Sequence, residues 1–83
     1  MRANRKKSVE ALVVAFDSTA SALAFDSAAK RAELSGRLCP VPRSLSVGCG
    51  LAWRGDPAAQ PQVQSLIDAE DIDDARIVVM MLR

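Results

Sequence analysis

Short apolar runs alternate in this chain with longer stretches whose apolar side chains recur at helical spacing, and this alternation restricts the fold more than any other feature. The first run, Ser8–Phe16, has β-branched valines between a charged segment and an aspartate, which is typical of a short buried strand. Polar residues that can cap a helix follow directly at Asp17–Ser18–Thr19. The alanine-rich stretch Thr19–Leu34 then predicts a helix, which we expect to end at Gly36.

The predicted helix over 19–34 has a polar face and an apolar face. Asp26 and Lys30 are spaced as an i,i+4 ion pair, and with Glu33 they form one polar stripe at about 100° per residue. The opposite face, which we expect to pack closely against a sheet, carries mostly small side chains: Ala20, Leu23, Ala24, Ser27 and Leu34.

The rest of the chain continues the alternation. The remaining predicted elements are a strand over Arg37–Val41, a loop over Arg43–Gly48, a strand over Cys49–Arg54, a turn at Gly55–Asp56–Pro57, a helix over Gln60–Ala69 and a strand over Ala75–Leu82. Prolines at 40 and 42 favour a sheet edge for the first of these, because proline donates no backbone hydrogen bond. We expect Trp53 to fill the core or plug a sheet face.

This order of elements, βαββαβ, predicts an α+β fold. It is the order of the ferredoxin-like sandwich, in which two helices cover one face of a four-stranded antiparallel sheet. Right-handed crossovers would place the first and third strands in the middle of the sheet. A chain of 83 residues allows one domain, which we place at 10–83, after a flexible basic tail over 1–9.

Composition excludes several kinds of site. The chain has no histidine, so it offers neither an imidazole base nor a histidine metal ligand. Its two cysteines are too few for a four-thiolate metal site, and the acidic stretch over 68–74 matches no calcium loop, so we expect no metal. The net charge of +1 provides no general attraction for nucleic acid or an anionic membrane.

The apolar runs are short. None approaches the roughly 20 residues that span a bilayer, and 11–16 is shorter than the roughly 7–15 residues of a secretory core. We therefore expect a cytoplasmic protein. We also expect no RNA binding, because an aromatic platform and a basic sheet face are not predicted.

One loop concentrates the reactive residue types. In the predicted topology the hairpin loop lies at the same end of the sheet as the helix start at Ser18 and Thr19. Cys49, which begins the next strand, would then lie near the positive end of that helix, where a thiol loses its proton more easily. Arg43 would reinforce this effect. The arrangement suits a nucleophilic thiolate or an anion cradle.

The surroundings of the two cysteines in the sequence differ. Gly48 and Gly50 flank Cys49, so the backbone can bend there and little bulk shields the sulfur. Cys39 lies in a predicted strand, where a cysteine often acts as a small buried hydrophobe. It is also the second thiol of the chain, which could act together with Cys49. A disulfide between them would require Cα atoms within about 7 Å of each other, and in the cytosol it would be transient.

The stretch from Pro40 to Arg54, PVPRSLSVGCGLAWR, resembles the signature of the small bacterial family described as putative selenium/sulfur carrier-like proteins. The matching parts are a PVPR element, a serine-rich stretch and a CGLA element: Pro40-Val41-Pro42-Arg43, Ser44 and Ser46, and Cys49-Gly50-Leu51-Ala52. The sequence departs from that signature at Val47, where another serine is expected.

The resemblance implies a carrier in which Cys49 holds a persulfide or selenosulfide, with Arg43, Ser18 and Thr19 stabilising the anion. Such a protein needs donor and acceptor proteins and no other cofactor, and it is a carrier more than a free-standing enzyme. A shorter CPxP element at Cys39 resembles the motif of TusA-like sulfur carriers, but a helix follows the motif in that family and a hairpin loop is predicted here.

Two other classes of function stay open. The first is a binding or regulatory module, which dimerises through the apolar strand Ile77–Leu82 or binds a small anion at the same loop without covalent chemistry. The second is a redox sensor, in which Cys39 and Cys49 form a reversible disulfide. The sequence does not distinguish sulfur from selenium as the transferred atom.

Overall fold

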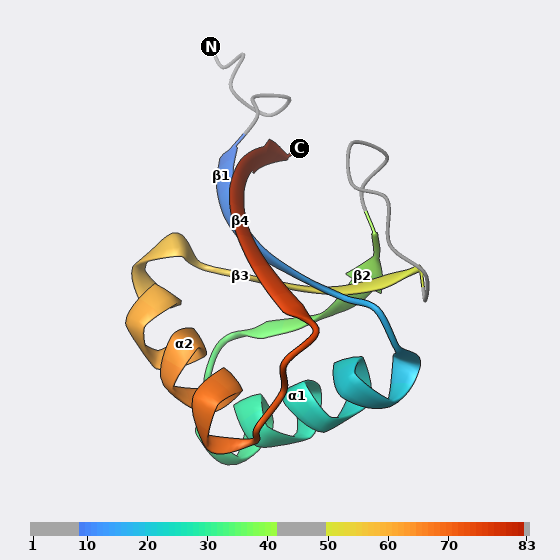
Figure 1. Ribbon diagram of the computed structural model, residues 1–83. Coiled ribbons are helices and arrows are strands. Elements are labelled where there is room, and N and C mark those ends of the chain that lie inside the picture. Colours follow the sequence, from blue (N-terminus) through green and yellow to red (C-terminus); the bar gives the residue numbers. More distant parts are fainter. Residues whose placement is uncertain (1–8, 42–49, 83) are drawn as a thin grey trace, which may run out of the picture.

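The computed structural model describes residues 9–41 and 50–82 of the chain (Figure 1). Its elements are β1 (Val9–Phe16), α1 (Thr19–Arg31), β2 (Gly36–Pro40), β3 (Leu51–Gly55), a short 3₁₀ turn η2 (Pro57–Ala59), α2 (Gln60–Ala69) and β4 (Ala75–Leu82). The predicted order βαββαβ is confirmed, and the second helix and the last strand have the predicted bounds. Of the predicted basic tail, residues 1–8 lie outside the described part of the chain.

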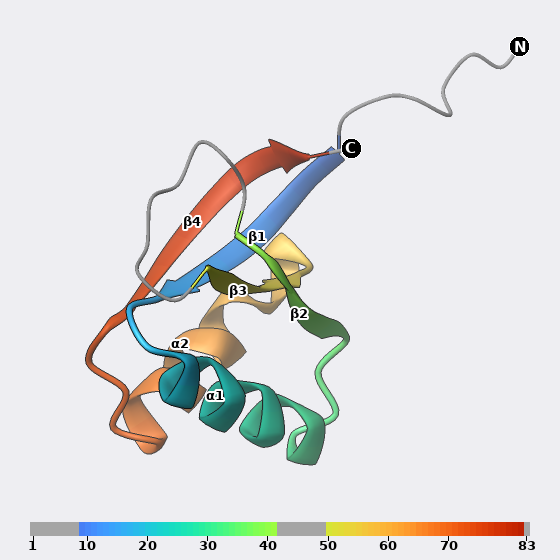
Figure 2. The same ribbon diagram turned by 90° about the vertical axis from the view of Figure 1, so that its right-hand side faces the viewer.

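The four strands form one antiparallel sheet in the order β2-β3-β1-β4. This is the ferredoxin-like arrangement, with the first and third strands in the middle as predicted. Both helices lie on one side of the sheet (Figures 1 and 2). We call this side the helix face and the opposite side the open face. The β1–β4 ladder is long, from Val9↔Leu82 to Phe16↔Ala75, whereas β2 and β3 pair over five residues.

The hydrophobic core lies between the helices and the helix face. Phe25 of α1 is fully buried there between Phe16 of β1 and Trp53 of β3. Its ring centroid is 5.7 Å from that of Phe16 and 5.2 Å from that of Trp53, where the rings meet edge to face. Such pairs contribute about 0.5–1.5 kcal/mol beyond the area they bury. Val63 and Ile67 of α2 complete this core.

The predicted packing face of α1 is wrong. The buried side chains are Ala22, Phe25, Ala28 and Ala29. Leu23, which we expected inside, is 51% exposed, and Ala20, Ala24 and Ser27 are exposed too. The large ring of Phe25 sets the orientation of the helix, because burying it gains more free energy than burying a row of alanines. The predicted ion pair is confirmed, with Lys30 Nζ 3.1 Å from Asp26 Oδ2.

The predicted end of α1 is also wrong. The helix ends at Arg31, and Glu33, with φ 60°, takes the left-handed conformation that often ends helices. The backbone N–H of Leu34 then donates to the carbonyl of Ala29. Gly36 instead begins β2, and it must be small for a different reason. A Cβ there would overlap the indole ring of Trp53.

Candidate functional site

The chain between β2 and β3, which contains Cys49 and which we call the cysteine-bearing loop, has both of its ends at one end of the sheet. Pro40, the last residue of β2, pairs with Leu51, and the N–H of Val41 donates to the carbonyl of Gly50 at 3.0 Å. Ala52 pairs with Ala15, so this end of the sheet is also where β1 leads into α1. The ends of this loop therefore lie at the same end of the sheet as the start of α1, as the predicted topology requires. Cys49, Arg43 and Gly48 lie outside them, and their roles stay predictions.

Gly50, which follows Cys49 in the chain, has a conformation that requires glycine. Its φ of 74° lies in the left-handed region, which side-chain-bearing residues rarely adopt. A Cβ built on Gly50 would meet no heavy atom within 4 Å. The backbone therefore turns sharply beside Cys49, and the described residues leave open space at that turn.

The start of α1 already holds a carboxylate of the chain itself. Ser18 is the N-cap, and its Oγ accepts a hydrogen bond from the N–H of Ser21 at 3.2 Å. The same hydroxyl lies 2.9 Å from Oγ of Ser21 and 3.3 Å from Oδ2 of Asp74, so it can donate to either. Asp74 stands just before β4, 56 residues further along the chain. The N-terminus of α1 is therefore already next to a carboxylate, which belongs to the residue that precedes β4.

The environment of Asp74 favours its charged form. Burial raises the pKa of the carboxyl group, but the hydroxyl of Ser21, the N–H of Asp74 itself, the hydroxyl of Ser18 and the N–H of Asp17 together hold it below its ordinary value. This role of Asp74 was not predicted from the sequence, where the acidic stretch over 68–74 was compared only with a calcium loop. The predicted stabilisation of a sulfur anion by Ser18 and Thr19 stays a prediction, and Asp74 competes for the same hydroxyl.

Cys39 lies on the open face of the sheet, half-buried and directly across from Ala52. Burial raises the pKa of its thiol, and the positive charges of Arg54 and Arg37 offset this only in part. At neutral pH the group is therefore mainly the protonated thiol, which is a poor nucleophile. The predicted disulfide with Cys49 stays a prediction.

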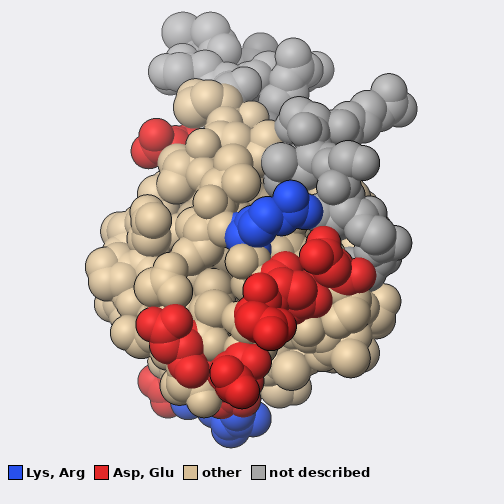
Figure 3. Space-filling view, viewed as in Figure 1, with Lys and Arg blue, Asp and Glu red and all other residues tan. Residues whose placement is uncertain are grey.

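The open face carries three arginines, which corrects the expectation that the sheet would have no basic face. Alternation along the strands places Arg37, Arg54 and Arg76 on the side away from the buried Trp53. Arg76 pairs with Asp17 at 3.6 Å, whereas neither Arg37 nor Arg54 makes an ion pair with a carboxylate of the described residues. The acidic side chains visible in Figure 3 gather mostly lower down, over the helices and the connection into β4.

Two general features of the described residues limit other kinds of site. Between 9–41 and 50–82, no group of three or more histidine, cysteine or acidic residues could hold a metal ion. No helix in the same ranges is long and apolar enough to cross a membrane.

Comparison with known families identifies the class of the protein. Residues 11–79 match the model of the family described as "Putative Se/S carrier protein-like". The chain belongs to this family. The match runs from β1 into β4 and includes both cysteines, and it confirms the resemblance seen in the stretch from Pro40 to Arg54. No curated protein and no solved structure shows a significant match.

Proposed function

We propose that this protein is a sulfur or selenium carrier, in which Cys49 accepts one atom from a donor and passes it to an acceptor protein. The observation that carries the proposal is the family match over residues 11–79, which includes Cys49. The described geometry supports it at two points. The turn at Gly50 has open space beside it, and the hydrogen bond from Val41 to Gly50 holds the loop ends at the same end of the sheet as the start of α1.

The proposed transfer is a balanced exchange between sulfur atoms. The thiolate of Cys49 attacks the outer sulfur of a donor persulfide, and a new S–S bond forms at Cys49. The donor's own S–S bond breaks, its inner sulfur leaves as a thiolate, and the proton on the outer sulfur moves with that atom. A nucleophile of the acceptor then attacks the outer sulfur, and Cys49 leaves as a thiolate. If selenium is transferred, the outer atom is selenium, and the corresponding S–Se bonds form and break in the same order.

The residues of this chain have separate roles in the proposal. Arg43 and the start of α1 at Ser18 and Thr19 stabilise the anion on Cys49. Asp74 opposes it, because its carboxylate already accepts the hydroxyl of Ser18 at 3.3 Å. Cys39 stays protonated and does not compete for the transferred atom, because burial raises the pKa of its thiol.

The test loads the protein with a small persulfide, such as glutathione persulfide, and measures the intact mass. We expect the parent and Cys39→Ser to gain one sulfur atom, which dithiothreitol removes, and Cys49→Ser to gain none. Cys39→Ser is the matched control, since it removes the other thiol of the chain. If Cys49→Ser accepts sulfur as readily as the parent, the carrier proposal is wrong.

A binding module that dimerises is the second candidate, and one observation favours it. β4 is an edge strand of eight residues, and its side chains Val79 and Met81 are 40% and 59% exposed. Exposed apolar edge strands tend to pair with a second chain. Sedimentation before and after alkylation of Cys49 separates the two functions. Assembly that needs Met81 but survives alkylation would favour the module.

A further inference from the structure

A pocket opens where the β2–β3 ladder begins, at the end of these strands away from the cysteine-bearing loop. Its volume is ≈ 340 Å³, and its lining residues are Ser35, Gly36, Arg37, Arg54, Gly55 and Asp56. Binding sites for small molecules start at about 300 Å³. The pocket is thus large enough for an anionic group attached to a small organic molecule.

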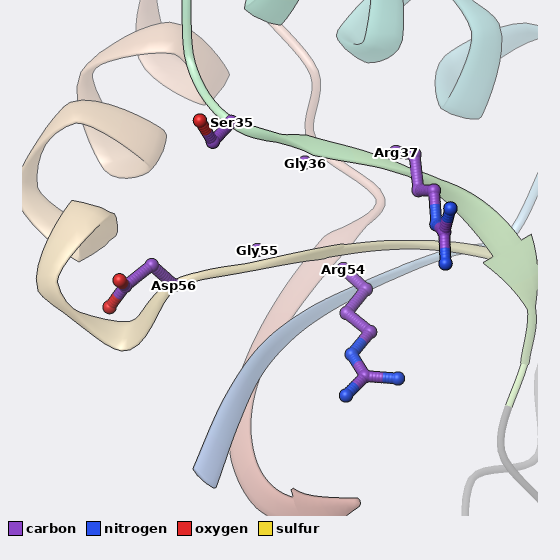
Figure 4. A pocket seen from close by; sticks show the side chains of 6 residues that line it. All are labelled: Ser35, Gly36, Arg37, Arg54, Gly55 and Asp56. Carbon is purple, nitrogen blue, oxygen red and sulfur yellow. The ribbon is translucent and has the colours of Figure 1, made fainter. Parts of the chain in front are cut away.

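The two arginines of the pocket lie directly opposite each other. The register pairs Arg37 of β2 with Arg54 of β3. Figure 4 shows both side chains extending from their neighbouring strands to the same side, away from α1. Like charges that face each other across an antiparallel pair destabilise the sheet. The folded chain therefore keeps a repulsion that an anion between the two side chains would remove.

The acidic residue that lines the pocket does not remove this repulsion. Asp56 lies at the other end of the pocket in Figure 4, and its Oδ1 accepts a hydrogen bond from the N–H of Ala58 at 2.9 Å. It thereby caps the η2 turn. Within 9–41 and 50–82, no carboxylate forms an ion pair with either arginine.

The wall between the two arginine side chains and the core is made of backbone. Gly36 pairs with Gly55, and a Cβ on either residue would overlap the indole ring of Trp53. The ring therefore lies against both glycines from the helix face. Because Trp53 is fully buried and packed edge to face on Phe25, this wall is rigid and holds the two strands at a set position.

We propose that this pocket binds the phosphate group of a small phosphorylated molecule, held between Arg37 and Arg54. The planar guanidinium group presents paired donors that match two phosphate oxygens, and two such groups from adjacent strands supply two positive charges. The proposal does not depend on Cys49 and concerns the other end of the sheet.

A small molecule fits the pocket better than a nucleic acid. Proteins that bind single-stranded RNA on a four-stranded sheet stack its bases on exposed aromatic side chains. Here Trp53 and Phe16 are fully buried on the helix face. The described residues of the open face include no aromatic side chain.

The test follows the backbone amide signals of Gly36 and Gly55 by NMR during titration with inorganic phosphate, ribose 5-phosphate and unphosphorylated ribose. We expect saturable shifts of both signals with the two phosphates and none with ribose. Arg37→Gln and Arg54→Gln should each weaken binding by about tenfold, because each removes charge-assisted hydrogen bonds. Arg37→Lys should recover part of the loss, since it restores charge without the planar donor pair.

The matched control is Arg31→Gln. The side chain of Arg31 is 67% exposed and pairs with Glu70 on the helical side of the molecule. The variant should bind phosphate like the parent. Equal weakening in this variant would show a general effect of net charge and overturn the proposal, as would the absence of saturable shifts. Binding of oligouridylate that needs Arg37 and Arg54, without binding of either small phosphate, would also overturn it and identify a nucleic-acid surface.

Discussion

The helix face and the open face of this sheet are built from the same four strands, yet they differ in chemistry. On the helix face, Trp53 and Phe16 are fully buried around Phe25 of α1. On the open face, the same strands present Cys39, Arg37 and other arginines to their surroundings, over a floor of small buried side chains such as Ala52. The large core side chains thus pack on one face, while the other buries only smaller apolar residues such as Val13 and Ala52 and can also carry charge and a thiol.

The largest effect is expected from removing the side chain at the centre of the core on the helix face. Phe25→Ala should cost about 3–5 kcal/mol, because it leaves a cavity between Phe16 and Trp53. A domain this small should be unfolded or nearly so as a result. Urea denaturation measures the change. The control is Leu23→Ala on the exposed side of α1, which should cost far less. A loss for Leu23→Ala as large as that for Phe25→Ala would contradict the exposure of Leu23.

The next prediction concerns the packing of the Trp53 ring against Gly55. Gly55→Ala should cost about 1–3 kcal/mol, because the added methyl group overlaps the ring of Trp53. The cost should shrink in a Trp53→Leu background, since the ring is then absent. A double-mutant cycle by urea denaturation measures this coupling. If the two substitutions are additive, the glycine has some other role.

A smaller effect of opposite sign is expected on the open face. Arg37→Gln should stabilise the protein in buffer without phosphate by about 0.2–1 kcal/mol, because it removes the repulsion from Arg54. The gain should fade at high salt, which screens exposed charges. Thermal denaturation with Arg31→Gln as control measures it. A loss of stability would mean that Arg37 makes a favourable interaction in the folded state.

The carboxylate at the start of α1 should make stability depend on pH. The pKa of Asp74 is lowered on folding, so its charged form contributes stability at pH values above its ordinary pKa of 3.8. That contribution is lost as the pH falls through 3.8 toward the lower pKa of the folded state. Asp74→Asn should therefore lose less stability on acidification than the parent. An unchanged acid transition would contradict the assignment, and Asp73→Asn, an exposed neighbour, is the control.

The smallest effect is expected for the thiol of Cys39 on the open face. Because burial raises the pKa of Cys39, its alkylation in Cys49→Ser should need a higher pH than alkylation of a small free thiol. Arg54→Gln should raise that pH further, because the positive charge of Arg54 lowers the pKa. Alkylation at the pH typical of an activated thiolate would instead make Cys39 a second candidate for the carrier function.

Local patterns in the sequence determined the order and type of the elements. The β-branched runs and the alanine-rich stretch are local features, so rules of periodicity and capping predict the strands and helices that they form. The α2 and β4 bounds, the pair of Asp26 with Lys30 and the burial of Trp53 follow from such rules. The family resemblance was likewise carried by one contiguous stretch.

Only the tertiary structure decided which side chains meet across the sheet and at its ends. Arg37 faces Arg54 because of strand register, and Gly36 is small because Trp53 packs against it. Asp74 reaches Ser18 across 56 residues. None of these contacts leaves a local signal, since a shift of one residue in register would move every side chain to the other face. The face that α1 buries was decided in the same way, by the space that Phe16 and Trp53 leave for Phe25.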